Sequence, residues 1–208
     1  MNRPDLLKRG DKVCIVATAR KISRDEVEPS VELFESWGLQ VVLGDHLFAE
    51  DHQFAGSDEQ RLSDLQNAFD DPDIKAVFCA RGGYGSARLL DKLSFDGLSN
   101  SPKWLVGYSD ITALHLHIHK HLNLETIHGT MPVNIHRNPD EAETKSVESL
   151  KALLYGEPLS YQIPDHPFSR KGDCSGKLIG GNLSMIYSLL GSNTKPNFDG
   201  IVLFLEDL

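Results

Sequence analysis

A serine stands at the point where an apolar run of the sequence meets a turn. Residues 104–108 read Trp-Leu-Val-Gly-Tyr, Ser109 and Asp110 follow at once, and apolar residues then recur at helical spacing. A strand, a tight turn and a helix with serine at the turn form a nucleophile elbow, which presents the hydroxyl at the carboxyl end of a sheet. The G-x-S-x-G pattern is not met, because Ile111 stands where the second glycine would. The alternative is that Ser109 or Asp110 only caps the helix.

A glycine-rich turn follows a second apolar run. Residues 80–86 read Ala-Arg-Gly-Gly-Tyr-Gly-Ser. Glycines let the backbone approach a ligand and present free N–H groups, so this turn is a candidate anion-binding loop or half of an oxyanion hole. It lacks the Gly-Lys-Ser/Thr ending of a phosphate loop and is not a full G-x-G-x-x-G. The alternative is a turn whose glycines serve only the backbone geometry.

Four histidines lie close together after the serine. His115 and His119, like His117 and His121, would share a helix face, which is a spacing that metal ions use. No acidic residue stands between them in the H-E-x-x-H manner. We interpret them as solvated or helix-face histidines. We expect no metal, no cofactor and no dependence on Zn²⁺ or Mg²⁺.

Composition excludes several classes of protein. The chain has 208 residues, 40% of them hydrophobic and 25% charged, with a formal net charge of -9. That charge disfavours binding to nucleic acids or anionic membranes. No apolar run approaches the roughly 20 residues of a membrane helix, and the N-terminus has no signal-peptide core. Cys14 and Cys79 lie in apolar runs and are expected to be buried. We predict a cytoplasmic protein.

Apolar runs alternate with amphipathic stretches, which predicts an α/β fold with a doubly wound, mostly parallel sheet. Pro29 would occupy the first position of one helix, and Ser57 with Gln60 forms a capping box for the next. Pro139 would open a further helix that Gly156 ends. The predicted strands are residues 13–17, 39–43, 76–80, 104–108 and 125–128.

The character of the sequence changes after this α/β domain, which we place at residues 1–155. Residues 156–176 contain three prolines and little apolar periodicity, and are predicted to be a linker. Residues 177–208 hold a short helix at 182–190 and end inside a strand-like run. We expect them to be the beginning of a smaller β-rich domain, and the sequence to be a fragment.

Five short motifs, taken in order, resemble one known family. The sequence is similar to the LD-carboxypeptidases, or muramoyltetrapeptide carboxypeptidases, which include the microcin C immunity peptidases. The resemblance covers nearly all of the chain. It implies a serine peptidase with a Ser-Glu-His triad, an N-terminal α/β domain and a smaller C-terminal β-rich domain. The motifs are Ala80-Arg-Gly-Gly-Tyr-Gly, Gly107-Tyr-Ser-Asp-Ile-Thr112, His128-Gly129, Gly180-Gly-Asn-Leu183 and Leu205-Glu-Asp207.

The resemblance assigns catalytic roles to individual residues. Ser109 matches the nucleophile and Glu206 the triad glutamate, while the backbone N–H groups of Asp110 and Gly83 match the oxyanion hole. The family's triad histidine lies well downstream of the glutamate, so we expect it beyond residue 208 and expect these 208 residues alone to be inactive. Among the histidines present, His128 is expected nearest the carboxyl edge of the sheet, in a structural role.

The implied activity is release of terminal D-alanine from a peptidoglycan tetrapeptide, with a small muropeptide as partner and a homodimer as the assembly. A carboxypeptidase must bind a free carboxylate, and Arg81 is our candidate; a structural ion pair is the alternative. Residues 17–20 read Ala-Thr-Ala-Arg where relatives commonly show Ala-Pro-Ser, a difference we assign to a loop and not to the chemistry. The alternatives in function are an immunity-type peptidase acting on a peptide-nucleotide antibiotic and a non-catalytic α/β binding domain.

Overall fold

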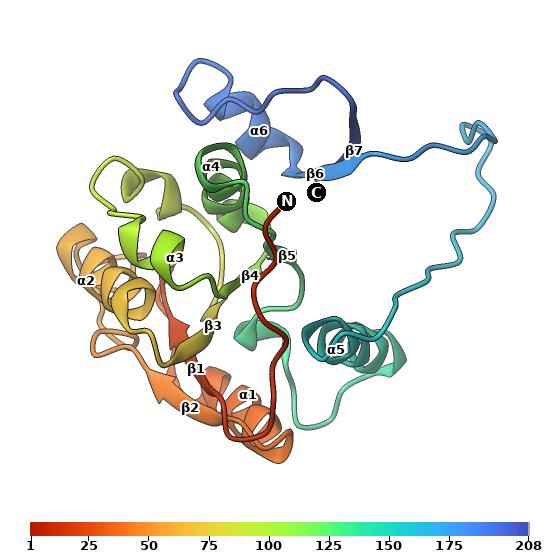
Figure 1. Cartoon of the computed structure of the whole chain (residues 1–208). Helices are drawn as coiled ribbons and strands as arrows, with labels where there is room; N and C mark the ends of the chain where they lie inside the picture. The colour runs from red at the N-terminus through yellow and green to blue at the C-terminus, as the bar shows by residue number, and fades with distance from the viewer. Residues whose placement is uncertain (208) are drawn as a thin grey trace.

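A parallel five-stranded sheet forms the centre of the computed structural model, which describes residues 1–207 (Figure 1). The strand order is β2-β1-β3-β4-β5, so the connections reverse direction across the sheet between β1 and β3. The central strands are buried because helices cover both faces of the sheet. The predicted doubly wound α/β fold is confirmed. The strands are β1 (Lys12–Val16), β2 (Gln40–Leu43), β3 (Ile74–Cys79), β4 (Trp104–Gly107) and β5 (Ile127–His128).

Two apolar clusters, one on each face, hold the helices to this sheet. Helices α2, α3 and α4 pack on the face that includes Cys14 of β1, whereas α1 and α5 pack on the face that includes Ile15. Successive residues of a strand point to opposite faces, so each central strand serves both clusters. The helices are α1 (Arg24–Ser36), α2 (Asp58–Asp70), α3 (Asp96–Asn100), α4 (Thr112–Leu122) and α5 (Glu141–Leu154), with short 3₁₀ turns η1 (Ser86–Arg88), η2 (Ser109–Ile111) and η3 (Pro132–Asn134).

Capping boxes decide where the first two long helices begin. Gln60 donates its backbone N–H to the Ser57 hydroxyl and accepts the Ser57 N–H, which confirms the predicted start of α2. At α1 the same exchange joins Ser23 and Glu26. Pro29 therefore lies inside α1, and its prediction as the first helical residue was wrong. The reciprocal cap satisfies backbone donors that would otherwise be unpaired, so it outweighs the preference of proline for a first turn.

Helix α5 begins slightly later than its proline suggested. Asp140 is the N-cap, with Glu143 completing a capping box, so the helix starts two residues after Pro139. Gly156 follows the last turn with a φ of 86°, a left-handed conformation that glycine adopts without strain, and it ends the helix as predicted.

The last part of the described chain forms a second, two-stranded sheet. Residues 156–176 contain neither helix nor strand and loop away from the body of the molecule (Figure 1). Strand β6 (Lys177–Asn182) runs into α6 (Leu183–Leu189) and pairs in parallel with β7 (Ile201–Glu206). Within residues 1–207, no helix combines the length and the apolar character needed to cross a membrane.

The two cysteines predicted to be buried are buried. Cys14 and Cys79 are free thiols inside the sheet, and burial raises the pKa of each to about 12. They are therefore protonated and unreactive at neutral pH, as small apolar residues of the core.

Candidate active site

The turn after β4 has the backbone of a strained elbow. Ser109 has a φ of 61°, in the left-handed region that costs a residue with a side chain about 1–2 kcal/mol. This confirms the strained turn that the sequence predicted. No side chain caps η2 or α4, so the alternative in which Ser109 or Asp110 only caps the helix was wrong. Gly107 permits the turn, because a methyl group there would lie 2.8 Å from Cγ1 of Ile111.

The glycine turn after β3 lies directly against this elbow. A methyl group at Gly82 would come within 3.3 Å of the Ser109 Cβ and 3.5 Å of both its Oγ and the backbone nitrogen of Asp110. Gly83 and Gly85 have φ values of 124° and 147°. Glycine at these positions therefore allows the backbone of one loop to approach the serine of another. The assignment of the Asp110 and Gly83 N–H groups to an oxyanion hole stays a prediction.

The side chain of Asp110 holds the two loops together. It is 1% exposed, and its Oδ2 accepts the backbone N–H of Ser86 at 2.9 Å. The Ser86 hydroxyl in turn lies 2.8 Å from the hydroxyl of Thr18, just after β1, so one buried chain of hydrogen bonds joins the ends of β1, β3 and β4. The roles of Thr18 and Ser86 were not predicted from the sequence. The only signal was that small polar residues follow strand ends, because their partners lie far away in sequence.

Arg81 is already engaged by neighbouring groups. Its Nη1 donates to the backbone oxygen of Lys21 at 3.1 Å and lies 3.5 Å from Oε1 of Glu26. These are the contacts of the structural ion pair that the sequence left open as the alternative. A role for Arg81 in binding a substrate carboxylate stays a prediction.

The two-stranded sheet that carries Glu206 is docked on the first turn of α4 through β6. Glu206 pairs in register with Asn182 at the end of β6, and the Asn182 backbone N–H donates to the Thr112 hydroxyl at 3.0 Å. A side chain at Gly181 would collide with Thr112, so glycine allows this close approach. Since Thr112 is three residues after Ser109, β6 and β7 lie beside the elbow. Oε1 of Glu206 is buried and has no hydrogen-bond partner among the described residues.

All four clustered histidines lie on α4, as expected of helix-face residues, but two of them are buried and not solvated. His115 is 6% exposed, with Nε2 lying 2.9 Å from the Gly107 oxygen, and His117 is 8% exposed, with Nδ1 lying 3.0 Å from the Thr194 hydroxyl. Burial lowers the pKa of each to about 4. Solvation was the wrong expectation for these two residues because α4 packs against the sheet on the side of His115, and against Phe95 and Thr194 on the side of His117.

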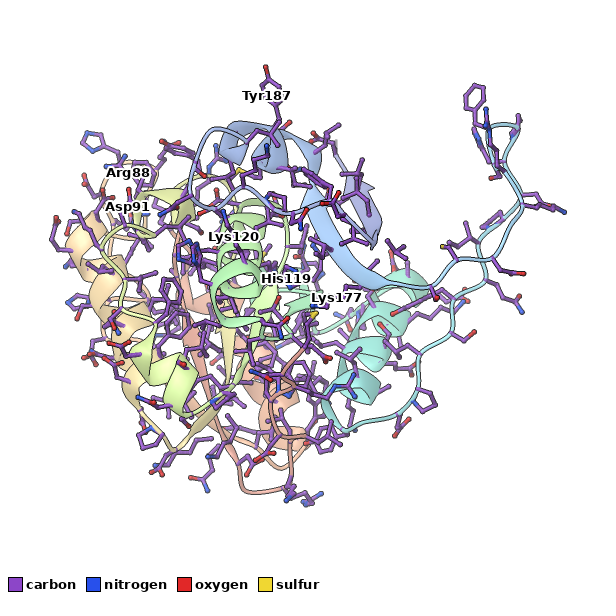
Figure 2. The ribbon with its side chains drawn as sticks, turned by 45° about the horizontal axis from the view of Figure 1, so that its top comes forward. Arg88, Asp91, His119, Lys120, Lys177 and Tyr187 are labelled. Carbon is purple, nitrogen blue, oxygen red and sulfur yellow. The ribbon has the colours of Figure 1, made fainter. Side chains whose placement is uncertain are left out.

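Within residues 1–207, no group of three or more histidine, cysteine, aspartate or glutamate side chains has the arrangement of a metal site. His119 lies beside Lys177 of β6 (Figure 2). Burial, together with the positive charge of Lys177, lowers the pKa of His119. Burial therefore stabilises the neutral form of His115, His117 and His119.

His128 does lie at the carboxyl edge of the sheet. Its ring centroid is 6.0 Å from that of Tyr108 and 5.1 Å from that of Phe204 in β7. Neither His128 nor any other imidazole of the described chain hydrogen-bonds Ser109. A general base for this serine is thus not among the hydrogen-bonded neighbours within residues 1–207.

A cavity of about 550 Å³ opens beside the elbow. Its wall includes Tyr108, the residue before the serine, together with His128, Gly129 and Asn134 from the end of β5 and the following loop. Helix α5 supplies the opposite wall. The volume is within the range of small-molecule sites, and a ligand bound here would contact Tyr108, the residue next to Ser109.

Models of a known protein family match both ends of this fold. The model described as the LD-carboxypeptidase N-terminal domain matches residues 13–129, and the one described as the LD-carboxypeptidase C-terminal domain matches residues 175–208. The chain belongs to the LD-carboxypeptidase family. The family resemblance inferred from the sequence motifs is therefore confirmed.

Curated relatives of this LD-carboxypeptidase family member have murein-related names. The chain is 35% identical over 208 residues to a probable murein peptide carboxypeptidase of Bacillus subtilis, covering 99% of this chain and 65% of the relative. It is 38% identical over 208 residues to a murein tetrapeptide carboxypeptidase of Pseudomonas aeruginosa, covering 95% of this chain and 66% of the relative. The chain thus spans about two thirds of the length of these relatives.

Solved structures share the fold. An MccF-like protein from Bacillus anthracis superposes with a TM-score of 0.84 at 26% identity, covering 99% of this chain and 69% of that one. A muramoyltetrapeptide carboxypeptidase from Oxalobacter formigenes has a TM-score of 0.76 at 26% identity, covering 93% and 65%. The microcin C7 self-immunity protein MccF, in complex with aspartyl sulfamoyl adenosine, has a TM-score of 0.83 at 22% identity, covering 97% of this chain and 70% of that one. This similarity shows a shared fold alone.

Proposed function

We propose that this chain carries the nucleophile of a serine carboxypeptidase that cleaves the L,D-amide before a terminal D-alanine in peptidoglycan-derived tetrapeptides. The observation that carries the proposal is Ser109, held at a positive φ between β4 and α4 with Gly82 closed against it. Backbone strain at a residue with a side chain persists where a functional geometry requires it. The names of the curated relatives support murein as the source of the substrate.

The proposed reaction is acyl transfer through the serine. The Ser109 hydroxyl attacks the carbonyl carbon of the scissile amide while a base takes its proton. The negative charge that develops on the carbonyl oxygen is stabilised by the backbone N–H groups of Asp110 and Gly83, at a few kcal/mol for each donor. The amine of D-alanine then leaves with a proton returned by the base, and water hydrolyses the acyl-enzyme.

Glu206 is proposed to orient that base. By the family resemblance the base is an imidazole downstream of Glu206 in the sequence. A carboxylate that accepts the second imidazole N–H holds the correct tautomer and stabilises the imidazolium that forms. The buried, unpartnered Oε1 of Glu206 has the acceptor capacity that such a contact needs.

A second candidate is cleavage of a peptide-nucleotide antibiotic, as in an immunity peptidase. It is favoured by the superposition on the MccF-like protein from Bacillus anthracis, at 26% identity. A non-catalytic binding domain is the third outcome. The strain at Ser109 argues against it, because a turn that only connects two elements gains nothing from a left-handed serine.

Incubation of the full-length protein with a murein tetrapeptide and, separately, with a peptidyl-adenylate separates these functions when the products are resolved by mass. We expect D-alanine release from the tetrapeptide, and a fall in kcat of about 10⁴-fold or more in Ser109→Ala with the fold retained. Ser99→Ala, at an exposed position of α3, is the matched control. Near-wild-type turnover by Ser109→Ala would refute the assignment of the nucleophile.

A further inference from the structure

Four arginines surround the glycine turn that lies against Ser109. Three of them have acidic partners: Arg61 and Arg88 both pair with Asp58, and Arg81 pairs with Glu26. Arg61 also donates to the backbone oxygen of residue 18. Each of the three is therefore held by a carboxylate, and Asp58 holds two of them. None of the three is a free cation for a ligand.

Arg20 is different. It forms no hydrogen bond and no ion pair with any residue in the described part of the chain. Its side chain is exposed, so its guanidinium keeps all five N–H donors available in water. The chain as a whole is negatively charged, with a net charge of -9, so the unpaired positive charge of Arg20 provides a local site that attracts an anionic ligand.

The stem of Arg20 lies on the glycine turn itself. A methyl group at Gly83 would come within 2.6 Å of both Cγ and Cδ of Arg20 and 3.0 Å of its Nε. The preceding residue, Gly82, is the one that closes against Ser109 and the backbone nitrogen of Asp110. Arg20 therefore packs on the same turn that contacts the nucleophile, at the next glycine along the chain. The loop after β1 that carries it is where this sequence reads Ala-Thr-Ala-Arg.

The chemistry of a carboxypeptidase requires a cation at such a place. The carboxyl carbon of the leaving residue is three bonds from the scissile carbonyl carbon, which puts it within about 4 Å of that carbon. When Ser109 attacks, the free carboxylate must therefore lie next to the serine and the glycine turn. A guanidinium binds a carboxylate through two parallel N–H donors, which fixes its orientation as well as its charge.

We propose that Arg20 is a specificity-determining residue that binds the free C-terminal carboxylate of the leaving amino acid. The inference rests on the proposed function and replaces our expectation that residues 17–20 affect only a loop. It assigns the carboxylate to Arg20 instead of Arg81, because Arg81 is held by Glu26 and the backbone of Lys21. Peptides whose last carboxyl group is amidated lose this contact and are selected against.

The test compares a tetrapeptide ending in D-alanine with the same peptide ending in D-alaninamide. In Arg20→Gln we expect kcat/KM for the free acid to fall by about 10- to 100-fold, mainly through KM, since a hydrogen-bonded charge contact contributes about 1.5–3 kcal/mol. For the amidated peptide, Arg20→Gln should have the same kcat/KM as the wild type. Arg20→Lys should recover part of the loss, because an ammonium retains the charge without the two-donor geometry.

Lys21→Gln is the matched control. It removes one positive charge from the next residue, whose side chain pairs with Glu50 and not with the glycine turn. An equal loss in Lys21→Gln would show that the effect is general electrostatic attraction and would overturn the proposal. So would equal losses on both peptides in Arg20→Gln, or a selective loss on the free acid in Arg81→Gln but not in Arg20→Gln.

Binding separates this inference from the proposed function. If the wild type cleaves neither peptide, the proposed function fails. The role of Arg20 can still be decided by binding: calorimetry gives the Kd of each peptide for the Ser109→Ala protein and for the same protein that also carries Arg20→Gln. A preference for the free acid that Arg20→Gln abolishes supports it. Equal affinity for both peptides, or a preference that survives the substitution, overturns it.

Discussion

Acidification tests the buried state of His115 on α4. Its Nε2 lies 2.9 Å from the Gly107 oxygen, its Nδ1 is buried without a partner, and burial lowers its pKa from 6.5 to about 4. The carbonyl accepts a hydrogen bond, so Nε2 carries the proton of the neutral ring and Nδ1 would receive the second proton. Protonation in the folded state would place a charge inside the core, directly behind the serine turn.

The sign and size of the effect follow from these values. Between pH 6.5 and about 4 the unfolded chain binds a proton at this histidine and the folded chain does not, so the free energy of unfolding rises with pH. The contribution is complete above the unfolded pKa and is lost as pH falls toward the folded one. The full shift corresponds to about 3 kcal/mol. Between about pH 7 and about pH 4.5 the loss is about 2 kcal/mol.

Urea unfolding at these two pH values, for the wild type and His115→Gln, measures this contribution. The glutamine amide can donate to the Gly107 oxygen but does not titrate, so the variant should lose about 2 kcal/mol less stability on acidification than the wild type. His121→Gln, which removes an exposed imidazole from the same helix, is the matched control. Carboxylates with lowered pKa values, such as Glu26 and Asp73, cancel in the comparison because both proteins contain them.

An identical pH dependence in His115→Gln and the wild type would refute the reasoning. It would mean that His115 titrates alike in the folded and unfolded chains, and hence that the ring is solvated in solution.

Two further predictions concern residues beside the serine. Asp110→Ala should lower the free energy of unfolding by about 1–3 kcal/mol, because the Ser86 N–H loses its buried acceptor, and should lower kcat while changing KM less. Asp110→Asn should recover most of the lost stability and most of the lost kcat. Faster amide hydrogen exchange at Ser86 in the alanine variant is the direct readout, and unchanged exchange would contradict the contact. Glu206→Gln should lower kcat by about 10³-fold or more with KM little changed, if the carboxylate orients the base. An unaltered kcat would remove Glu206 from the catalytic machinery.

Local patterns in the sequence were sufficient for much of the scaffold. Some features depend only on residues close together in the sequence, so they can be predicted without knowing the fold. They are the apolar runs, the Ser57–Gln60 capping box and the glycine after α5. The elbow at Ser109 belongs to this class as well. An apolar run that meets a turn and then a helical pattern predicts a tight turn at Ser109, and the structure shows that the serine has a φ of 61° there.

Only the tertiary structure decided which polar side chains are used by the protein itself and which are left for a ligand. Arg81 stands beside the glycine turn in sequence, yet Glu26 occupies it; Arg20 stands far from that turn in sequence, yet its stem lies on Gly83. The burial of His115 was equally hidden, because helical spacing gives the faces of a helix but not which face meets the sheet. Contacts between residues distant along the chain depend on how β1, β3 and β4 are arranged side by side, and no single segment of the sequence contains that information.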